Sequence, residues 1–216
     1  CPDGARVLID GLALAGFADL TDTHISRLRI LGLIHHPLAE ETGLSAQTRQ
    51  QLATRERNAL ALCKGVVVTS AFTAKQMATY GVPVSSVRVV SPGNDPARLA
   101  QGPSSGDPPS LLCVASVIPR KGHEVLIQAL ARLREISWNC VCVGSLTRAP
   151  TYAALVQEQA RTSGLSGRIC FTGECSTDVV NDFYDTSSVF VLPSHYEGYG
   201  MALVEAMLRG LPIVST

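Results

Sequence analysis

The sequence lacks several features that mark particular classes of protein. No apolar run approaches the roughly 20 residues that a membrane-spanning helix requires, and no secretory signal opens the chain. Its 18 basic and 18 acidic residues give a formal net charge of zero, which argues against a nucleic acid or an anionic membrane recognised through bulk charge. The seven cysteines include no Cys-x-x-Cys spacing, so buried reduced thiols and a cytoplasmic location are expected rather than a metal site or disulfides.

Two further absences concern the strands and the ends of the chain. No Gly-x-Gly-x-x-Gly follows any strand-like run, which disfavours a dehydrogenase with a Rossmann dinucleotide site. Position 1 is Cys, and the final residues PIVST resemble a parallel strand that would continue into a crossover helix. We therefore expect a fragment truncated at both ends.

Short apolar runs alternate with longer helical patterns along the whole chain. The apolar runs are typical of strands and lie at residues 7–11, 29–36, 65–70, 87–93, 111–116, 139–145, 168–173, 189–194 and 211–215. The helical patterns lie at residues 45–64, 73–80, 122–135, 151–163, 177–187 and 200–209. Ser45 is expected to cap the first of these helices, Gly65 to end it, and Gly81 to close the second.

Residues 93–109 are rich in Pro, Gly and Ser, a composition typical of a linker. The alternation of strands and helices on both sides predicts an α/β protein with two Rossmann-like, doubly wound parallel-sheet domains, residues 1–92 and 110–216, both incomplete. Ligands of such sheets bind beyond the carboxyl ends of the strands. We therefore expect the two domains to face a cleft that holds the substrate.

The stretch SHYEGYGMALVEAM at residues 194–207 has two carboxylates separated by seven residues. It predicts a strand, a turn and a helix, with the amides of Gly198, Tyr199 and Gly200 opening the helix as an anion site. Glu197 and Glu205 would then accept hydrogen bonds from hydroxyls on either side of a diphosphate. On spacing alone, a solvated loop glutamate and a helix-face glutamate explain the pair equally well.

A second cluster, PRKG at residues 119–122, follows the strand that ends near Ser116. Arg120 and Lys121 stand just before a helix, where adjacent cations suit a phosphate. Two solvated charges at a helix entrance are the alternative. Both clusters are expected at strand carboxyl ends of one sheet.

Together, PRKG and EGYGMALVE resemble family 4 glycosyltransferases, which have the GT-B fold, a basic pair before a glycine and an E-x7-E signature. The supporting matches span nearly the whole chain and are HHPLAEETGL at 35–44, VVVTS at 66–70, SPGND at 91–95, CVGS at 142–145 and FTGE at 171–174. One departure is Ala115-Ser116, where members often have Gly-Arg.

The resemblance implies a role for each residue of the two clusters. Arg120 and Lys121 would neutralise the donor diphosphate, and Glu197 would accept from sugar hydroxyls. The amides of residues 198–200 would hold the sugar and the β-phosphate, and Glu205 would bind the ribose. Further donor contacts are expected at the turns of Gly122, Gly144 and Gly173, the last two near the nucleobase.

A histidine at the end of an equivalent strand contacts the transferred sugar in the family, and His36 fits that place better than His35. A paired-histidine metal site lacks further ligands at usable spacing, and structural packing is the other alternative. His195 and His123 are expected to orient loops. Asp10 and Glu40 could be polar cleft residues, but neither is assigned to the site.

The resemblance further implies a retaining transfer from a UDP-, GDP- or ADP-sugar to a saccharide or lipid-linked acceptor, without metal or cofactor. The sequence has no Asp-x-Asp, the metal-binding motif of the other main glycosyltransferase fold. The rivals are a nucleotide-sugar epimerase of the same architecture and a non-catalytic nucleotide-sugar-binding subunit. No nucleic-acid partner is expected, and peripheral contact with the inner face of the membrane stays open.

Overall fold

The computed structural model describes residues 1–17 and 27–216, which form two compact units. Residues 1–93 with 197–199 make the first unit, and residues 94–196 with 200–216 make the second. Each unit contains one sheet with parallel strand pairings and a hydrophobic core of its own. The predicted α/β class with two parallel sheets is confirmed.

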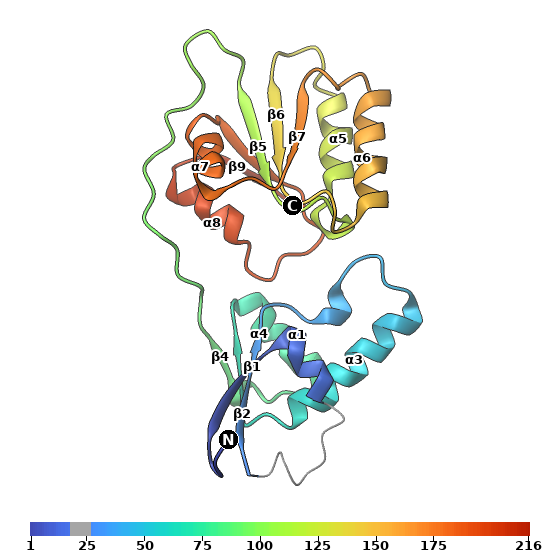
Figure 1. Cartoon of the computed structure of the whole chain (residues 1–216), viewed down its shortest axis with the longest axis vertical. Helices are drawn as coiled ribbons and strands as arrows, with labels where there is room; N and C mark the ends of the chain where they lie inside the picture. Colours follow the sequence, from blue (N-terminus) through green and yellow to red (C-terminus); the bar gives the residue numbers. More distant parts are fainter. Residues whose placement is uncertain (18–26) are drawn as a thin grey trace. The chain divides into compact units, whose positions relative to one another are not determined.

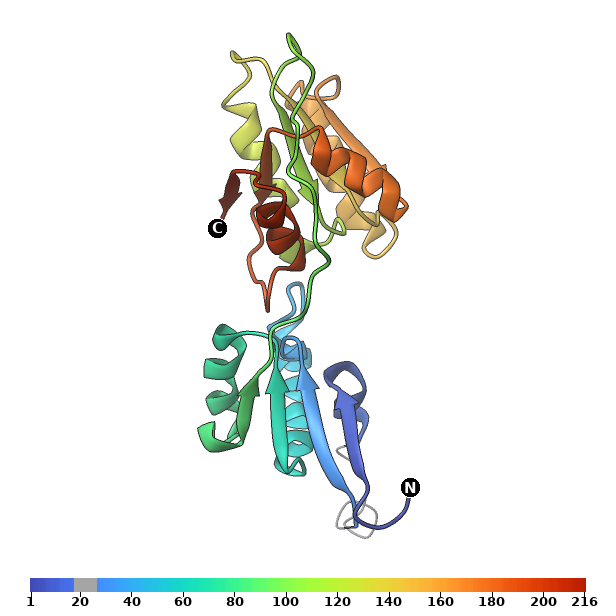
Figure 2. The same cartoon turned by 90° about the vertical axis from the view of Figure 1, so that its left-hand side faces the viewer.

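The first unit is built on four parallel strands in the order β1-β2-β3-β4. Alternate strand residues such as Ile30, Ile34, Val66 and Val68 are buried in its core. The strands are β1 (Arg6–Asp10), β2 (Arg29–Ile34), β3 (Gly65–Val68) and β4 (Val87–Val89), and the helices are α1 (Gly11–Leu14), α3 (Ala46–Ala61) and α4 (Ala71–Met77). Figure 2 shows the four strands side by side.

The caps of α3 and α4 follow local chemistry. The Ser45 hydroxyl accepts from the Thr48 amide at 3.0 Å, which confirms the predicted N-cap. Gly65 does not end α3: the helix stops at Ala61, because the Lys64 amide already donates to the Ile30 carbonyl of β2 at 2.8 Å. Gly81, at φ +78°, closes the 3₁₀ turn that follows α4, as predicted.

The second unit is built on five parallel strands in the order β7-β6-β5-β8-β9. These are β5 (Ser110–Val114), β6 (Asn139–Val143), β7 (Ile169–Gly173), β8 (Val189–Leu192) and β9 (Ile213–Ser215). The crossover helices are α5 (His123–Ala131), α6 (Pro150–Thr162), α7 (Thr177–Asp185) and α8 (Met201–Leu208). Because the strand order reverses after β7, right-handed crossovers place α5 and α6 on one face and α7 and α8 on the other (Figure 1).

The cysteines of the second unit lie mostly in its core. Cys113 of β5 pairs in register with Cys142 of β6, and both are buried, as is Cys140. All seven cysteines are free thiols, but burial was predicted too widely: Cys170 and Cys1 are exposed. Strand alternation explains Cys170, because its neighbour Ile169 takes the buried position.

Residues 90–109 contain neither helix nor strand. Part of this segment nevertheless packs on the rest of the second unit, since the amide of Ala100 donates to the Arg209 carbonyl and those of Gln101 and Gly102 donate to the Asp185 carbonyl, each at 2.9 Å. Within residues 1–17 and 27–216, no helix combines the length and the apolar character needed to cross a membrane.

Candidate functional site

PRKG and the residues that lead into the second sequence cluster lie at one edge of the second sheet. PRKG follows β5 and the Ser194–Tyr196 stretch follows β8, and these strands are hydrogen-bonded neighbours. Because the pairing is parallel, both loops leave the sheet at its carboxyl edge, where ligands of doubly wound sheets bind. The prediction that the clusters share one sheet and one edge is confirmed for PRKG and for residues 194–196, which lead into the second cluster, whereas Glu197–Tyr199 are grouped with the first unit.

Arg120 is held against the loop that follows β8. Pro119–Lys121 forms a 3₁₀ turn just ahead of α5. The backbone amide of His195 donates to the Arg120 carbonyl at 2.8 Å, and Arg120 Nη1 donates to the Tyr196 carbonyl at 2.9 Å. Half-buried Arg120 therefore ties the PRKG turn to the backbone that leads into Glu197, and half-buried Lys121 is its neighbour in that turn.

Gly122 allows this close approach. Its φ of +65° lies in the left-handed region, and a Cβ on it would lie only 1.9 Å from the Pro193 carbonyl oxygen. A side chain at this position would push the PRKG turn away from the 193–196 loop. The glycine thus has a packing reason beside its predicted role in donor binding.

A hydrogen-bonded chain of side chains supports the same loop. His195 Nε2 lies 2.8 Å from Glu124 Oε1 on the first turn of α5, and the Tyr152 hydroxyl of α6 donates to the other oxygen of Glu124. Burial alone would raise the pKa of Glu124, but the hydrogen bonds with His195 and Tyr152 outweigh burial and hold that pKa below its usual range. The predicted loop-orienting role of His195 is consistent with this contact.

The helix after the second cluster begins later than predicted. It starts at Met201, and Gly200 is its N-cap with φ +83°. The amides of Gly198 and Tyr199 therefore precede the helix. In its first turn the amides of Leu203 and Val204 donate to the Gly200 carbonyl, and among the described residues those of Met201 and Ala202 are the ones left for a ligand. The left-handed backbone at Gly200 makes the turn that sets this boundary.

Glu205 is held by α7. The hydroxyl of Tyr184 donates to Glu205 Oε2 at 3.0 Å and lies 3.3 Å from the Ala202 carbonyl oxygen. Arg209 lies over the Tyr184 ring at 4.4 Å and donates from Nη1 to the Glu205 carbonyl at 3.0 Å. Burial first, and then the adjacent Glu205 carboxylate, raise the pKa of Tyr184 far above its usual range, so the phenol stays a donor.

Gly144 and Gly173 lie at the carboxyl ends of β6 and β7, as predicted. A Cβ on Gly144 would lie 2.2 Å from the Ala115 carbonyl oxygen, so this glycine permits contact with the loop after β5. Gly173, at φ +76°, has open space at its Cβ position, and its carbonyl accepts from the Gly144 amide at 2.9 Å. The two turns are therefore joined through backbone.

The other predicted residues belong to the first unit. Glu197, Gly198 and Tyr199 are grouped there, and within that unit the Thr73 hydroxyl donates to the Gly198 carbonyl at 3.3 Å. His35 and His36 follow β2 rather than ending it, because the strand stops at Ile34.

Each of these histidines has a carboxylate neighbour. His36 Nε2 lies 3.5 Å from Glu41 Oε2. His35 Nε2 lies 3.0 Å from Asp10 Oδ2, a pair that the sequence analysis left unassigned. The signal was available, since parallel β1 and β2 end side by side. Glu40 lies in the 3₁₀ turn Leu38–Glu40.

Sequence reasoning missed Glu56. This buried carboxylate on α3 accepts from the amides of Leu38 and Ala39 at 2.5 and 3.2 Å. Burial raises its pKa, against the lowering effect of these two amides. Glu56 therefore fixes the turn that follows His36, and only its place on the buried side of a polar helix hinted at this.

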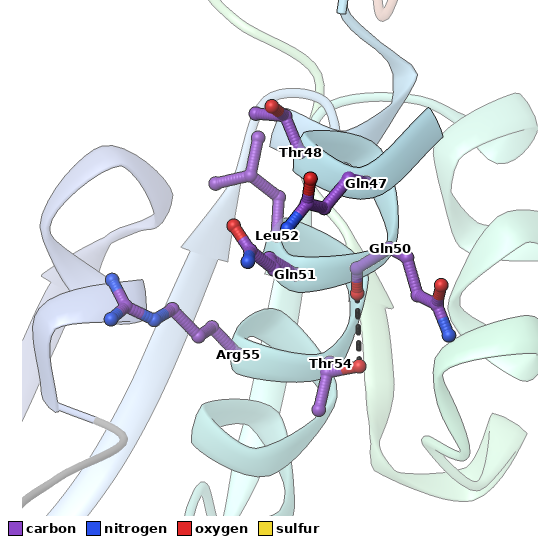
Figure 3. Close-up of a pocket in the computed structure, with 7 residues that line it drawn as sticks. All are labelled: Gln47, Thr48, Gln50, Gln51, Leu52, Thr54 and Arg55. Carbon is purple, nitrogen blue, oxygen red and sulfur yellow. Dashed lines mark hydrogen bonds between the residues drawn. The ribbon is translucent and has the colours of Figure 1, made fainter. Parts of the chain in front are cut away.

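A hollow of about 640 Å³ lies along α3 in the first unit. Figure 3 shows its lining side chains, which are mostly amides and hydroxyls with one guanidinium. None of the predicted site residues is among them; they are Gln47, Thr48, Gln50, Gln51, Leu52, Thr54 and Arg55.

His123 is a core residue. It is fully buried, with Nε2 at 3.7 Å from Cys113 Sγ. Within the described parts of the chain, no three His, Cys, Asp or Glu side chains gather closely enough to hold a metal ion.

Comparison with known proteins places these features in a family. Residues 94–216, more than half of the chain, match the family model described as glycosyl transferases group 1. A GDP-mannose-dependent α-(1-6)-phosphatidylinositol monomannoside mannosyltransferase of Mycobacterium tuberculosis is 25% identical over 167 residues, covering 69% of this chain and 43% of the relative. A D-inositol 3-phosphate glycosyltransferase of Xylanimonas cellulosilytica is 29% identical over 151 residues, covering 63% and 36%.

The solved structure of Anabaena Alr3699/HepE in complex with UDP and glucose shares the fold, with a TM-score of 0.77 and 23% identity over 96% of this chain and 58% of that one. The chain spans less than half the length of the two curated relatives, the mannosyltransferase and the inositol 3-phosphate glycosyltransferase. By the match over its second unit, the chain belongs to the glycosyl transferases group 1 family.

Proposed function

We propose that this chain is part of a family 4 enzyme that transfers a sugar, with retention of configuration and without a metal, from a nucleotide-diphosphate sugar to a hydroxyl of a saccharide or lipid-linked acceptor. The observation that supports this most directly is the docking of the Arg120 turn on the backbone after β8, through its carbonyl and its guanidinium. This docking places Arg120 and Lys121 beside the N-terminus of α5, at the carboxyl edge of the sheet. A diphosphate would be bound there.

Charge builds on the leaving diphosphate as the anomeric C–O bond breaks. Preorganised cations and amides placed where that charge develops lower the barrier, and removing one such group typically costs on the order of 10²–10³ in rate. In the proposed enzyme, Arg120 and Lys121 supply the cations, while the amides at the start of α8 supply neutral donors. Glu205 would accept from the ribose, and Glu197 and His36 would contact the transferred sugar.

The relatives support a nucleotide-sugar donor but differ in its base. The mycobacterial relative is named as GDP-mannose-dependent, and the Anabaena structure holds UDP. Metal independence is supported by the lack of Asp-x-Asp in the sequence. The proposal includes no cofactor.

Lys121→Ala tests the donor site directly. The melting temperature of the chain is measured with and without UDP, GDP, ADP and their glucose or mannose conjugates, at concentrations far above the expected Kd. A ligand at 100 times its Kd stabilises by about 2.7 kcal/mol, and we expect at least one of these ligands to do so. Lys121→Ala should remove most of that gain while changing the unliganded melting temperature little.

Arg132→Ala is the matched control, because Arg132 is an exposed cation at the other end of α5. It should leave the ligand-induced gain intact. Stabilisation by none of these ligands, or an equal loss in both variants, contradicts the proposed donor site. In the full-length enzyme, Lys121→Ala should also slow transfer of the sugar to an acceptor and the accompanying release of nucleoside diphosphate. The anomeric configuration of the product, read by NMR, tests retention.

A further inference from the structure

We infer that Tyr184 is a positioning residue for the nucleotide ribose, acting through its hydrogen bond to Glu205. This inference rests on the proposed function, in which Glu205 accepts from ribose hydroxyls. Tyr184 lies on α7, and the sequence analysis gave it no role. Its hydroxyl is the one described donor to the Glu205 carboxylate, at 3.0 Å from Oε2.

The hydrogen bond assigns the two oxygens of Glu205 different tasks. A carboxylate can accept several hydrogen bonds through its two oxygens. The hydrogen bond from the phenol to Oε2 restrains the orientation of the carboxylate. Among the described residues, Oε1 receives no donor, so it is the oxygen left for a ligand hydroxyl. A glutamate on α8 without this hydrogen bond would instead sample several rotamers, and binding would cost it that conformational freedom.

Tyr184 is itself rigidly placed. Its side chain is 1% exposed, its ring stacks on Phe190 of β8 with centroids 5.8 Å apart, and Arg209 lies over the ring at 4.4 Å. These contacts use the ring and not the hydroxyl. The phenol therefore links the core strand β8 to the carboxylate on α8.

The charge arrangement keeps the hydrogen bond in one direction. Burial and the Glu205 carboxylate raise the pKa of Tyr184 far above its usual range. The phenol therefore keeps its proton, and donates a hydrogen bond to Glu205, at every pH at which the protein would be studied. Arg209 is occupied by the Glu205 carbonyl and by Asn181 Oδ1, at 3.0 and 2.6 Å. It holds the end of α8 rather than the Glu205 carboxylate.

Tyr184→Phe removes the hydroxyl alone. Phenylalanine keeps the ring that contacts Phe190 and Arg209, so the variant is expected to fold. Its binding of UDP and GDP is measured by titration calorimetry, together with that of their 2′,3′-dideoxy forms. The unmodified chain should prefer the ribose form by about tenfold, as expected for a hydrogen bond to a charged group. Tyr184→Phe should bring the ratio of the two dissociation constants, dideoxy form over ribose form, close to one. Its affinity for the dideoxy form should change little.

Asn181→Ala is the matched control. It removes another hydrogen bond between α7 and the end of α8, the one to Arg209, and leaves the Tyr184–Glu205 contact intact. It should keep the ribose preference. In a Glu205→Gln background, Tyr184→Phe should cause no further loss, because the hydroxyl acts through the carboxylate.

The outcomes separate the inference from the function on which it rests. A preference that survives Tyr184→Phe, or that falls equally in Asn181→Ala, overturns the positioning role while the donor site stands. Absence of any preference in the unmodified chain overturns the assignment of Glu205 to the ribose, and the inference falls with it.

Discussion

A single methyl group at Gly122 tests how tightly the PRKG turn is packed. We expect Gly122→Ala to destabilise the second unit, because its Cβ would lie 1.9 Å from the Pro193 carbonyl oxygen in a left-handed backbone. Gly164, at φ +71°, has nothing within 4 Å of its Cβ position and is the matched control. Both variants meet the left-handed cost of about 1–2 kcal/mol, so the difference between them isolates the clash.

Urea denaturation measures the two losses in the free energy of unfolding. Overpacking of this kind typically adds about 1–3 kcal/mol, so Gly122→Ala should lose that much more than Gly164→Ala. Equal losses would mean that the turn moves away without cost and that Gly122 is chosen for another reason.

Single residues divide into those whose task is local and those whose task depends on a distant partner. Ser45 was predictable as a cap because its partner, the Thr48 amide, is three residues away. Glu205 was singled out by spacing, yet its contact with Tyr184 spans 21 residues and two helices. Nothing in the sequence pairs those two side chains, since the contact depends on α7 and α8 sharing a face of the sheet.

At the scale of elements, Glu124 connects α5 to α6 and to the loop after β8. We expect Glu124→Gln to lower stability at pH 7 and to flatten its acid dependence. The pKa of Glu124 in the folded chain lies below its ordinary value of 4.5, chiefly because the hydrogen bonds with His195 and Tyr152 outweigh burial. A depressed pKa stabilises the fold above the ordinary value, and that stabilisation is lost as pH falls through the folded pKa.

Melting temperatures from pH 7 to pH 3 provide the measurement. The difference in melting temperature between the unmodified chain and Glu124→Gln should be largest near neutral pH and should become smaller below about pH 4.5. Glu135→Gln, an exposed change in the segment that follows α5, should show no such gap. A gap that is constant across this range would show that the ionised form of Glu124 is not what stabilises the loop.

Element types were predicted well, but their ends were set by contacts outside each element. Every expected strand is present, because continuous apolar runs are what buried parallel strands require. The first long helix was predicted to run to Lys64, but it stops at Ala61, and the Lys64 amide donates to the Ile30 carbonyl of β2. The helix at the second cluster begins at Met201, since the left-handed Gly200 precedes it. Such boundaries depend on tertiary hydrogen bonds, which periodicity does not encode.

For the whole molecule, the linker composition correctly indicated a segment without regular structure. It did not indicate that residues 100–102 would be joined to the rest of the second unit by three backbone hydrogen bonds. The carbonyls that accept these bonds, those of Asp185 and Arg209, belong to residues at the ends of α7 and α8. Orphan carbonyls at helix ends need such partners, so this part of the linker belongs to the fold of the second unit.

The second unit should therefore fold as a chain that begins at residue 94. All the buried residues of its core lie between Leu112 and Leu211, and its five strands pair only with one another among the described residues. We expect residues 94–216 to unfold in one cooperative transition and to keep Arg120, Lys121 and Glu205 competent for UDP or GDP. A shorter chain, residues 104–216, keeps every buried residue of that core but loses Ala100, which packs against it, and the three amide bonds of residues 100–102. At about 1 kcal/mol for each amide bond, and with partial compensation by water, their loss should lower the melting temperature by roughly 5 °C or more.

Calorimetry of both chains provides the test. Equal melting temperatures would mean that residues 100–102 act as linker alone. A broad, uncooperative transition in residues 94–216 would mean that the second unit depends on the first.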